Sequence, residues 1–77
     1  MTQLQRAFYL LTTRKLANFD FASHYILQYQ RVIHDLRHRY GFNVIMERTE
    51  NPKINMYYII VPDGCFANFD TMKFEEE

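Results

Sequence analysis

The 77-residue chain is long enough for one small domain, and with 48% hydrophobic and 23% charged residues it has the composition of a globular core rather than of a disordered or collagenous chain. Its longest apolar run, Met56 to Val61, is far shorter than the roughly 18 residues of a membrane span, and a single cysteine excludes an intramolecular disulfide framework. The formal net charge is zero, but it divides into +4 for residues 1–62 and −4 for residues 63–77. We therefore expect a cytoplasmic protein without a membrane partner. Its basic body would be either a polyanion-binding surface or an ordinary solvated one.

The first half of the chain predicts two helices. A Thr-x-x-Gln capping box at residues 2–5 precedes apolar residues at helical spacing, which predicts a helix over Gln3–Thr13. Asn18 or Asp20 is expected to cap a second, shorter helix that reaches Tyr25. The dense apolar content of this second segment is typical of a short helix buried on most of its surface.

A third helix is predicted from Gln28 to Tyr40. Its apolar stripe consists of Tyr29, Val32, Ile33, Leu36 and Tyr40. The opposite face carries Arg31, His34 and His38, flanked by Gln30 and Arg37. Gly41 follows at the position where a left-handed cap favours glycine. This helix therefore presents a basic, hydrogen-bonding face to a partner outside the core.

After Gly41 the apolar period changes from that of a helix to that of a strand. Residues 43–49 alternate and residues 54–61 are rich in Tyr and Ile, so the two segments predict an antiparallel hairpin. Residues 50–53 are expected to connect the two strands, in a turn with Pro52 in the favoured second position. Arg48, Asn51 and Lys53 would lie at its tip.

The acidic, aromatic tail of residues 63–77 allows more than one structure. A helical turn can begin after Asn68 or Asp70. Alternatively, the aromatic residues of the tail can pack back onto the body or onto a second subunit; these residues are Phe66, Phe69 and Phe74.

The third predicted helix and the residues after it resemble one known family. Residues 32–37 and 40–44 are similar to the small winged helix-turn-helix proteins of phages and mobile elements, whose third helix ends in Arg-Ile-x-Asp-Leu-Arg, followed two residues later by Gly-Tyr-x-Ile. The matching positions are Ile33, Asp35, Leu36, Arg37, Gly41 and Phe42, whereas Val32 replaces the family's Arg. The resemblance covers residues 3–61. It implies an α+β fold, with a winged helix-turn-helix domain over residues 1–62 in which three helices are followed by a β-hairpin wing.

The resemblance and the basic third helix together predict sequence-specific binding of double-stranded DNA, in a transcriptional regulator or an excision factor. The expected base-reading residues are Gln28, Gln30, Arg31 and His34. The expected phosphate contacts are Arg14, Lys15, Arg37, His38, Arg48 and Lys53. A homodimer through the tail is expected to suit a palindromic site.

Two other partners are compatible with the same residues. The first is a host protein that a phage-encoded winged-helix scaffold binds and inhibits. The second is single-stranded nucleic acid stacked on Tyr57 and Tyr58, although tyrosines in a hairpin more often pack within it.

Catalysis and metal binding are not expected. His34 and His38 have the i, i+4 spacing of a metal-binding pair, but no third ligand is nearby and two arginines flank them. The two glycines, Gly41 and Gly64, form no phosphate-binding loop, and Cys65 has no evident base beside it. The sequence therefore predicts a binding protein that is not an enzyme and uses no cofactor.

Overall fold

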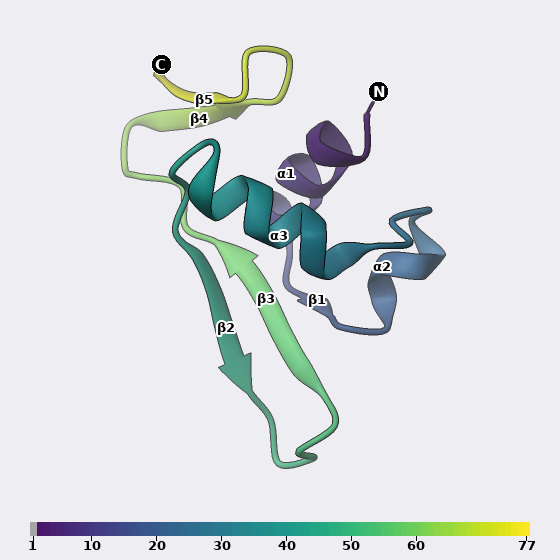
Figure 1. The fold of residues 1–77 in the computed structure, drawn as a ribbon. Helices are drawn as coiled ribbons and strands as arrows, with labels where there is room; N and C mark the ends of the chain where they lie inside the picture. The colour runs from purple at the N-terminus through teal and green to yellow at the C-terminus, as the bar shows by residue number, and fades with distance from the viewer. Residues whose placement is uncertain (1) are drawn as a thin grey trace.

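Three helices and two small antiparallel sheets form a mixed α+β structure in the computed structural model, which describes residues 2–77 (Figure 1). In chain order the elements are α1 (Gln3–Thr13), β1 (Leu16–Ala17), α2 (Asp20–Ser23), α3 (Tyr29–His38), β2 (Val44–Arg48), β3 (Asn55–Ile59), β4 (Cys65–Asn68) and β5 (Lys73–Glu76). The predicted α+β class and the order of three helices before a hairpin are confirmed.

The first helix, α1, has the predicted bounds and the predicted capping box. The Thr2 hydroxyl accepts the Gln5 amide at 3.1 Å, and the Gln5 side-chain oxygen accepts the Thr2 amide at 2.9 Å. Its buried residues are Ala7, Phe8, Leu10 and Leu11. Two otherwise unpaired amides are thus satisfied at the helix start, while one apolar face enters the core.

The second helix, α2, is shorter than predicted, and the prediction of its cap is wrong. It ends at Ser23 because Tyr25 adopts a left-handed conformation (φ 64°). There the Tyr25 and Ile26 amides donate to Ala22 and Phe21, which is a Schellman turn. Asn18 and Asp20 do not cap the helix because their side chains bond elsewhere. The Asp20 carboxylate accepts the Ala17 amide, and the Asn18 side chain donates to Lys53 and accepts the amide of Asn55.

The third helix, α3, runs from Tyr29 to His38, and Val32, Ile33 and Leu36 are buried as predicted. Tyr40 lies beyond the helix end and is 36% exposed, so its predicted place on the buried stripe is wrong. Gly41 has φ 74°, and a Cβ there would meet no atom within 4 Å, so the dihedral angle alone favours glycine. This reversal lets the following residue, Phe42, donate its amide to Leu36 and stack on Phe8 at 4.4 Å.

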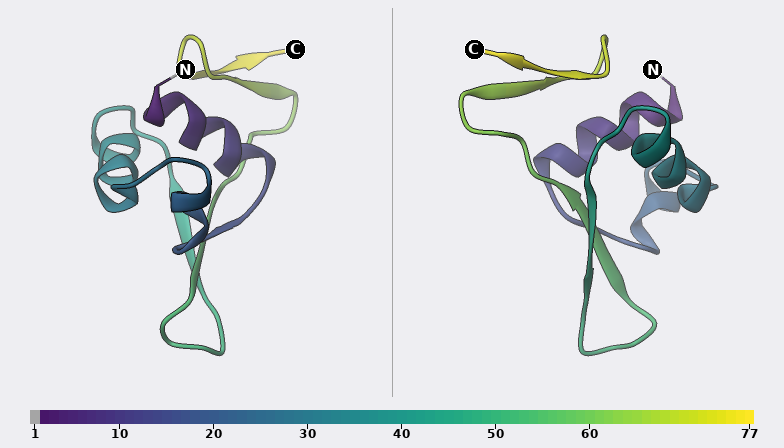
Figure 2. Two further views of the ribbon diagram at one scale, coloured as in Figure 1. Left: turned by 90° about the vertical axis from the view of Figure 1, so that its right-hand side faces the viewer. Right: turned by 60° about the vertical axis from the view of Figure 1, so that its left-hand side comes forward.

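The predicted hairpin is β2–β3, and it forms most of a three-stranded sheet with the order β1-β3-β2. Its register places Val44 opposite Ile59 and Arg48 opposite Asn55. The sequence did not predict β1, whose two residues, Leu16 and Ala17, pair with Tyr57 and Met56 and are buried. The hairpin extends away from the helices and forms one end of the molecule (Figures 1 and 2).

The tail forms a second hairpin, β4–β5, at the other end of the molecule (Figures 1 and 2). The helical turn considered for it is wrong. The Asn68 side chain accepts the Asp70 and Thr71 amides, as a helix cap would, but the chain turns back into β5. Packing onto the body is confirmed for Phe69 and Phe74, which pack against a buried core that includes Met72, but not for Phe66, which is exposed.

Candidate nucleic-acid interface

The outer face of α3 is exposed along its whole length. Val32, Ile33 and Leu36 anchor the opposite face in the core, which fixes the rotation of the helix. The predicted partner-facing side chains are all exposed: Gln28, Gln30, Arg31, His34, Arg37 and His38. Their amide, imidazole and guanidinium groups can donate to, and in part accept from, base edges and phosphates.

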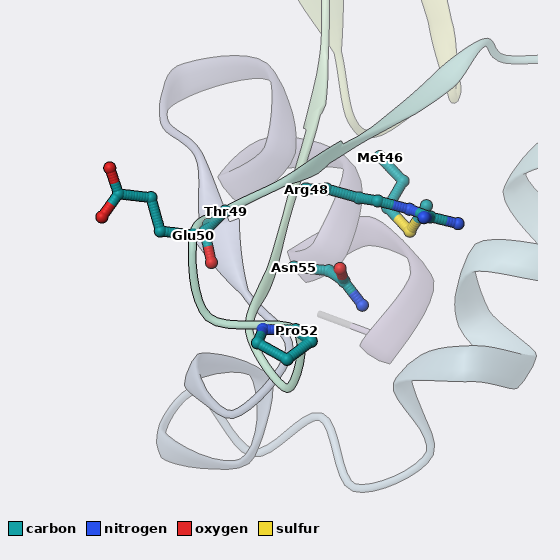
Figure 3. Close-up of a pocket in the computed structure, with 6 residues that line it drawn as sticks. All are labelled: Met46, Arg48, Thr49, Glu50, Pro52 and Asn55. Carbon is teal, nitrogen blue, oxygen red and sulfur yellow. The ribbon is translucent and has the colours of Figure 1, made fainter.

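One face of the β2–β3 hairpin is directed toward α3. Tyr57 on this face packs against Tyr29 of α3, with ring centroids 6.0 Å apart. Met46 lies opposite Tyr57 in the register and therefore shares this face. Because side chains alternate along a strand, Val44 and Arg48 share it as well, and so does Asn55, which lies opposite Arg48. Figure 3 shows the side chains of Met46, Arg48 and Asn55 projecting to one side, while Glu50 points away.

These hairpin residues surround an open hollow of about 550 Å³. Its lining consists of Met46, Arg48, Thr49, Glu50, Pro52 and Asn55 (Figure 3). The hollow lies near the tip of the hairpin, and Arg48 is its only cation. It offers one guanidinium to an anionic partner, on the opposite side of the hairpin from the Glu50 carboxylate (Figure 3).

The tip of the hairpin is held by its own hydrogen bonds. The Ile54 amide donates to the Asn51 carbonyl at 3.0 Å, so the tight turn spans residues 51–54 with Pro52 second. The predicted second position of Pro52 is confirmed, but the turn begins one residue later than the predicted 50–53. The Asn51 side-chain oxygen accepts a hydrogen bond from the Lys53 amide, and the Thr49 hydroxyl donates one to the Ile54 carbonyl at 2.8 Å. Lys53 is exposed on this turn, whose backbone is held by these hydrogen bonds.

Arg37 joins α3 to the base of the hairpin. Its Nη2 and Nε donate to the Val44 carbonyl at 2.7 and 3.3 Å. Burial raises the pKa of the nearby Tyr57 phenol, and Tyr29 adds to the rise, while the Arg37 charge acts in the opposite direction. The sequence predicted Arg37 as a phosphate contact. The structure adds a structural contact, because the Arg37 guanidinium ties α3 to the first residue of β2.

Lys15 lies apart from the other predicted site residues. Its Nζ pairs with Glu47 at 3.3 Å and lies 4.8 Å from the centre of the Tyr58 ring. Glu47 alternates with Arg48 along β2, so Lys15 occupies the face of the sheet opposite to Arg48. Arg14, at the end of α1, is exposed next to Lys15. The structure thus places the α3 residues and Arg48 on one side of the sheet, whereas Lys15 lies on the other side, with Arg14 next to it in the chain.

The two histidines of α3 are neighbours, with ring centroids 4.4 Å apart. Within residues 2–77, no group of three His, Cys, Asp or Glu side chains is arranged to hold a metal ion. The described part of the chain also contains no helix with the length and apolar character that a bilayer crossing requires.

Sequence reasoning missed one exposed residue at the start of α3. Leu27 is 77% exposed and lies beside Gln28, Gln30 and Arg31 around an open hollow of about 320 Å³. The signal was present in the sequence, because Leu27 precedes the helix and falls outside its apolar stripe. A leucine without a place in the core is a candidate contact residue.

Comparisons of the chain with protein-family models, with curated proteins and with solved structures found no match.

Proposed function

We propose that this chain is a winged helix-turn-helix protein that binds double-stranded DNA through α3 and the β2–β3 hairpin. The order helix, strand, helix, helix, strand, strand and the sheet order β1-β3-β2 support this assignment of the fold. The resemblance to phage and mobile-element proteins favours a role in transcription regulation or excision. In this assignment α3 enters the major groove and the hairpin is the wing.

The proposal rests on one observation: the exposed α3 residues and Arg48 of the hairpin lie on the same side of the sheet. The ten residues of α3 span about 15 Å along the helix axis, and an α-helix about 10–12 Å in diameter fits the roughly 12 Å wide major groove. With α3 in the groove, Arg48 on the α3-facing side of β2 is positioned for the flanking phosphates. Lys53 at the hairpin tip extends the same contact.

Charge pairing supports the same reading. Among residues 2–77 the single ion pair joins Lys15 to Glu47. Arg31 and Arg48 therefore have no carboxylate partner in the described chain and are available to phosphates. A surface that neutralises about four phosphates loses roughly two orders of magnitude in affinity between 50 and 200 mM salt, because bound counterions are released.

Fluorescence anisotropy with a labelled random-sequence duplex at 50 and 200 mM salt tests the proposal. We expect wild-type binding to depend strongly on salt. The double variant Arg31→Ala, His34→Ala should lose the wild type's preference for a duplex selected from the random pool over the pool itself. Lys73→Ala is the matched control, since it removes a cation from β5 at the far end of the molecule. Absence of binding at 50 mM salt by protein with the wild-type circular dichroism spectrum would refute the proposal.

A second candidate function is binding of a host protein. It is favoured by exposed aromatic side chains beside α2, where Phe19 is 62% and Tyr25 is 76% exposed. An apolar protein interface changes little in affinity with salt, whereas DNA binding changes steeply. The two-salt experiment therefore separates the candidates once a partner has been captured.

A homodimer through the tail is also part of the proposal. Phe69 and Phe74 already pack against the body of their own chain, which leaves Phe66 of β4, 42% exposed, as the aromatic residue offered to a second copy. Sedimentation equilibrium of the wild type and Phe66→Ser tests this contact. Equal masses for both proteins, each that of a monomer, would exclude it.

A further inference from the structure

Leu27 is the most exposed large hydrophobic residue that the structure describes, at 77%. It precedes Gln28, the N-cap of α3, and an apolar residue at this position commonly packs on the fourth helical residue, here Val32. Val32 is 6% exposed and Ile26 is 1% exposed, so both neighbours are already in the core while Leu27 is not. Leu27 therefore contributes little to the start of α3, and its apolar surface is open to a partner.

The residues around Leu27 define what that partner offers. They form the open hollow of about 320 Å³ and consist of Leu27, Gln28, Tyr29, Gln30 and Arg31. The polar members, Gln28, Gln30 and Arg31, are exposed. No carboxylate lines the hollow. It combines an aliphatic side chain with amides that both donate and accept, and with one guanidinium.

The aliphatic and amide members of this combination match an A·T pair, while the Arg31 guanidinium suits guanine or a phosphate. In the major groove an A·T pair presents the adenine N7 acceptor, the adenine N6 donor and the thymine methyl group. A glutamine amide pairs with N7 and N6, and an aliphatic side chain contacts the methyl group. The exposed N4 donor of cytosine is usually bonded by a carboxylate, and none lines this hollow; the nearest one, Asp35, lines a neighbouring hollow with Gln28 and Arg31.

We infer that the start of α3 reads A·T pairs, with Leu27 covering a thymine methyl group while Gln28 or Gln30 bonds the adenine. The inference rests on the proposed function and names the base pair that this part of the surface selects. It also makes Leu27 a specificity-determining residue, because the methyl contact distinguishes thymine from every other base.

Replacement of thymine by uracil tests the contact, since it removes the methyl group and leaves the base pairing unchanged. A duplex is first selected by the wild-type protein from a random library, and its thymines are then replaced one at a time. At one or more positions we expect the wild type to bind the uracil duplex about fourfold more weakly, the ratio that corresponds to ~0.8 kcal/mol for one buried methyl-sized group. Leu27→Ala is expected to bind the thymine and uracil duplexes equally.

Ile60→Ala is the matched control, because Ile60 is also a large exposed aliphatic residue, at 63%, and lines a different hollow with Tyr40 and Phe74. This variant should keep the fourfold preference. Selected sites without a discriminating thymine, or a preference retained by Leu27→Ala, would overturn the inference while leaving DNA binding intact. If the wild type binds no duplex at all, the proposed function fails and the inference fails with it.

Discussion

The hairpins β2–β3 and β4–β5 have strands of similar length but contact the core in different ways. In β2–β3 the base is buried at Val44 and Ile59 and Tyr57 packs against the core, whereas strand residues nearer the tip, such as Met46 and Arg48, are exposed. The hairpin β4–β5 lies over α1, and Phe74 packs on Phe8 and Phe42 with ring centroids 5.8 and 5.2 Å apart.

The apolar residues at the turn account for this difference. The tip of β2–β3 is polar, with Glu50, Asn51 and Lys53, whereas the turn of β4–β5 contributes Phe69 and Met72 to the core region. A hairpin with an apolar turn is held against the body, and one with a polar turn projects from it. The projecting hairpin is therefore the one available to a partner, and it is the one with cations at its tip.

The largest expected effect distinguishes the two hairpins by their contribution to stability. Phe74→Ala in β5 should lower the free energy of unfolding by about 2–4 kcal/mol, because it removes a ring that packs on two core aromatics. Met46→Ala in β2 should change it by less than about 0.5 kcal/mol, because Met46 is 41% exposed. Urea unfolding of both variants measures the difference.

Leu36→Ala supplies the reference for that experiment. Leu36 is fully buried in α3, so its truncation should cost about 2–5 kcal/mol. If Phe74→Ala has no more effect than Met46→Ala while Leu36→Ala is strongly destabilising, the β4–β5 hairpin does not cover the core in solution.

A smaller effect distinguishes the hairpins by their charge. Arg48→Ala should weaken duplex binding about three- to tenfold and reduce the salt slope by about one, the effect of losing one phosphate contact. Glu76→Gln in β5 should strengthen binding by up to about twofold, since it removes an exposed negative charge distant from the contact. Anisotropy titrations of both variants check the opposite signs. The same sign for both would mean that the hairpins do not have separate electrostatic roles.

The same two hairpins show how far sequence reasoning reaches. The bounds of α1 were predictable because its capping box and its apolar spacing are local. The β2–β3 hairpin was predictable because alternation and Pro52 are local as well. Its tip residues, Arg48 and Lys53, were found for that reason.

The missed features depend on contacts between distant parts of the chain. Strand β1 has two residues and exists only because β3 pairs with it. Asn18 was predicted to cap α2, but its side chain bonds Lys53 and Asn55, which are far along the chain. Asn68 bonds the next amides as a helix cap does, and tertiary packing of Met72 and Phe74 decides that a hairpin follows. The pairing of Lys15 with Glu47, which separates it from the other site residues, is equally non-local.

The smallest expected effect concerns the joint between β2–β3 and the body, where Tyr57 packs beside Tyr29. Burial raises the pKa of the Tyr57 phenol above its ordinary value of about 10, with Tyr29 acting in the same direction. The phenol therefore ionises at a lower pH in the unfolded chain than in the folded one. Between the pKa of the unfolded chain and that of the folded chain, the folded state binds more protons. Stability is therefore unaffected by this group below about pH 10 and falls as the pH rises above it.

Tyr57→Phe isolates this contribution, because it keeps the ring packing on Phe21 and Tyr29 but removes the ionisable hydroxyl. Urea unfolding between pH 8 and 11 should show a steeper alkaline loss of stability in the wild type than in the variant. Tyr58→Phe is the control on the other face of β3, and it should retain the wild-type slope. Parallel curves for the wild type and Tyr57→Phe would mean that Tyr57 is as hydrated as in the unfolded chain, so that the hairpin moves away from α3 in solution. The shared side of α3 and Arg48, on which the proposed DNA contact depends, would then exist only when the partner is bound.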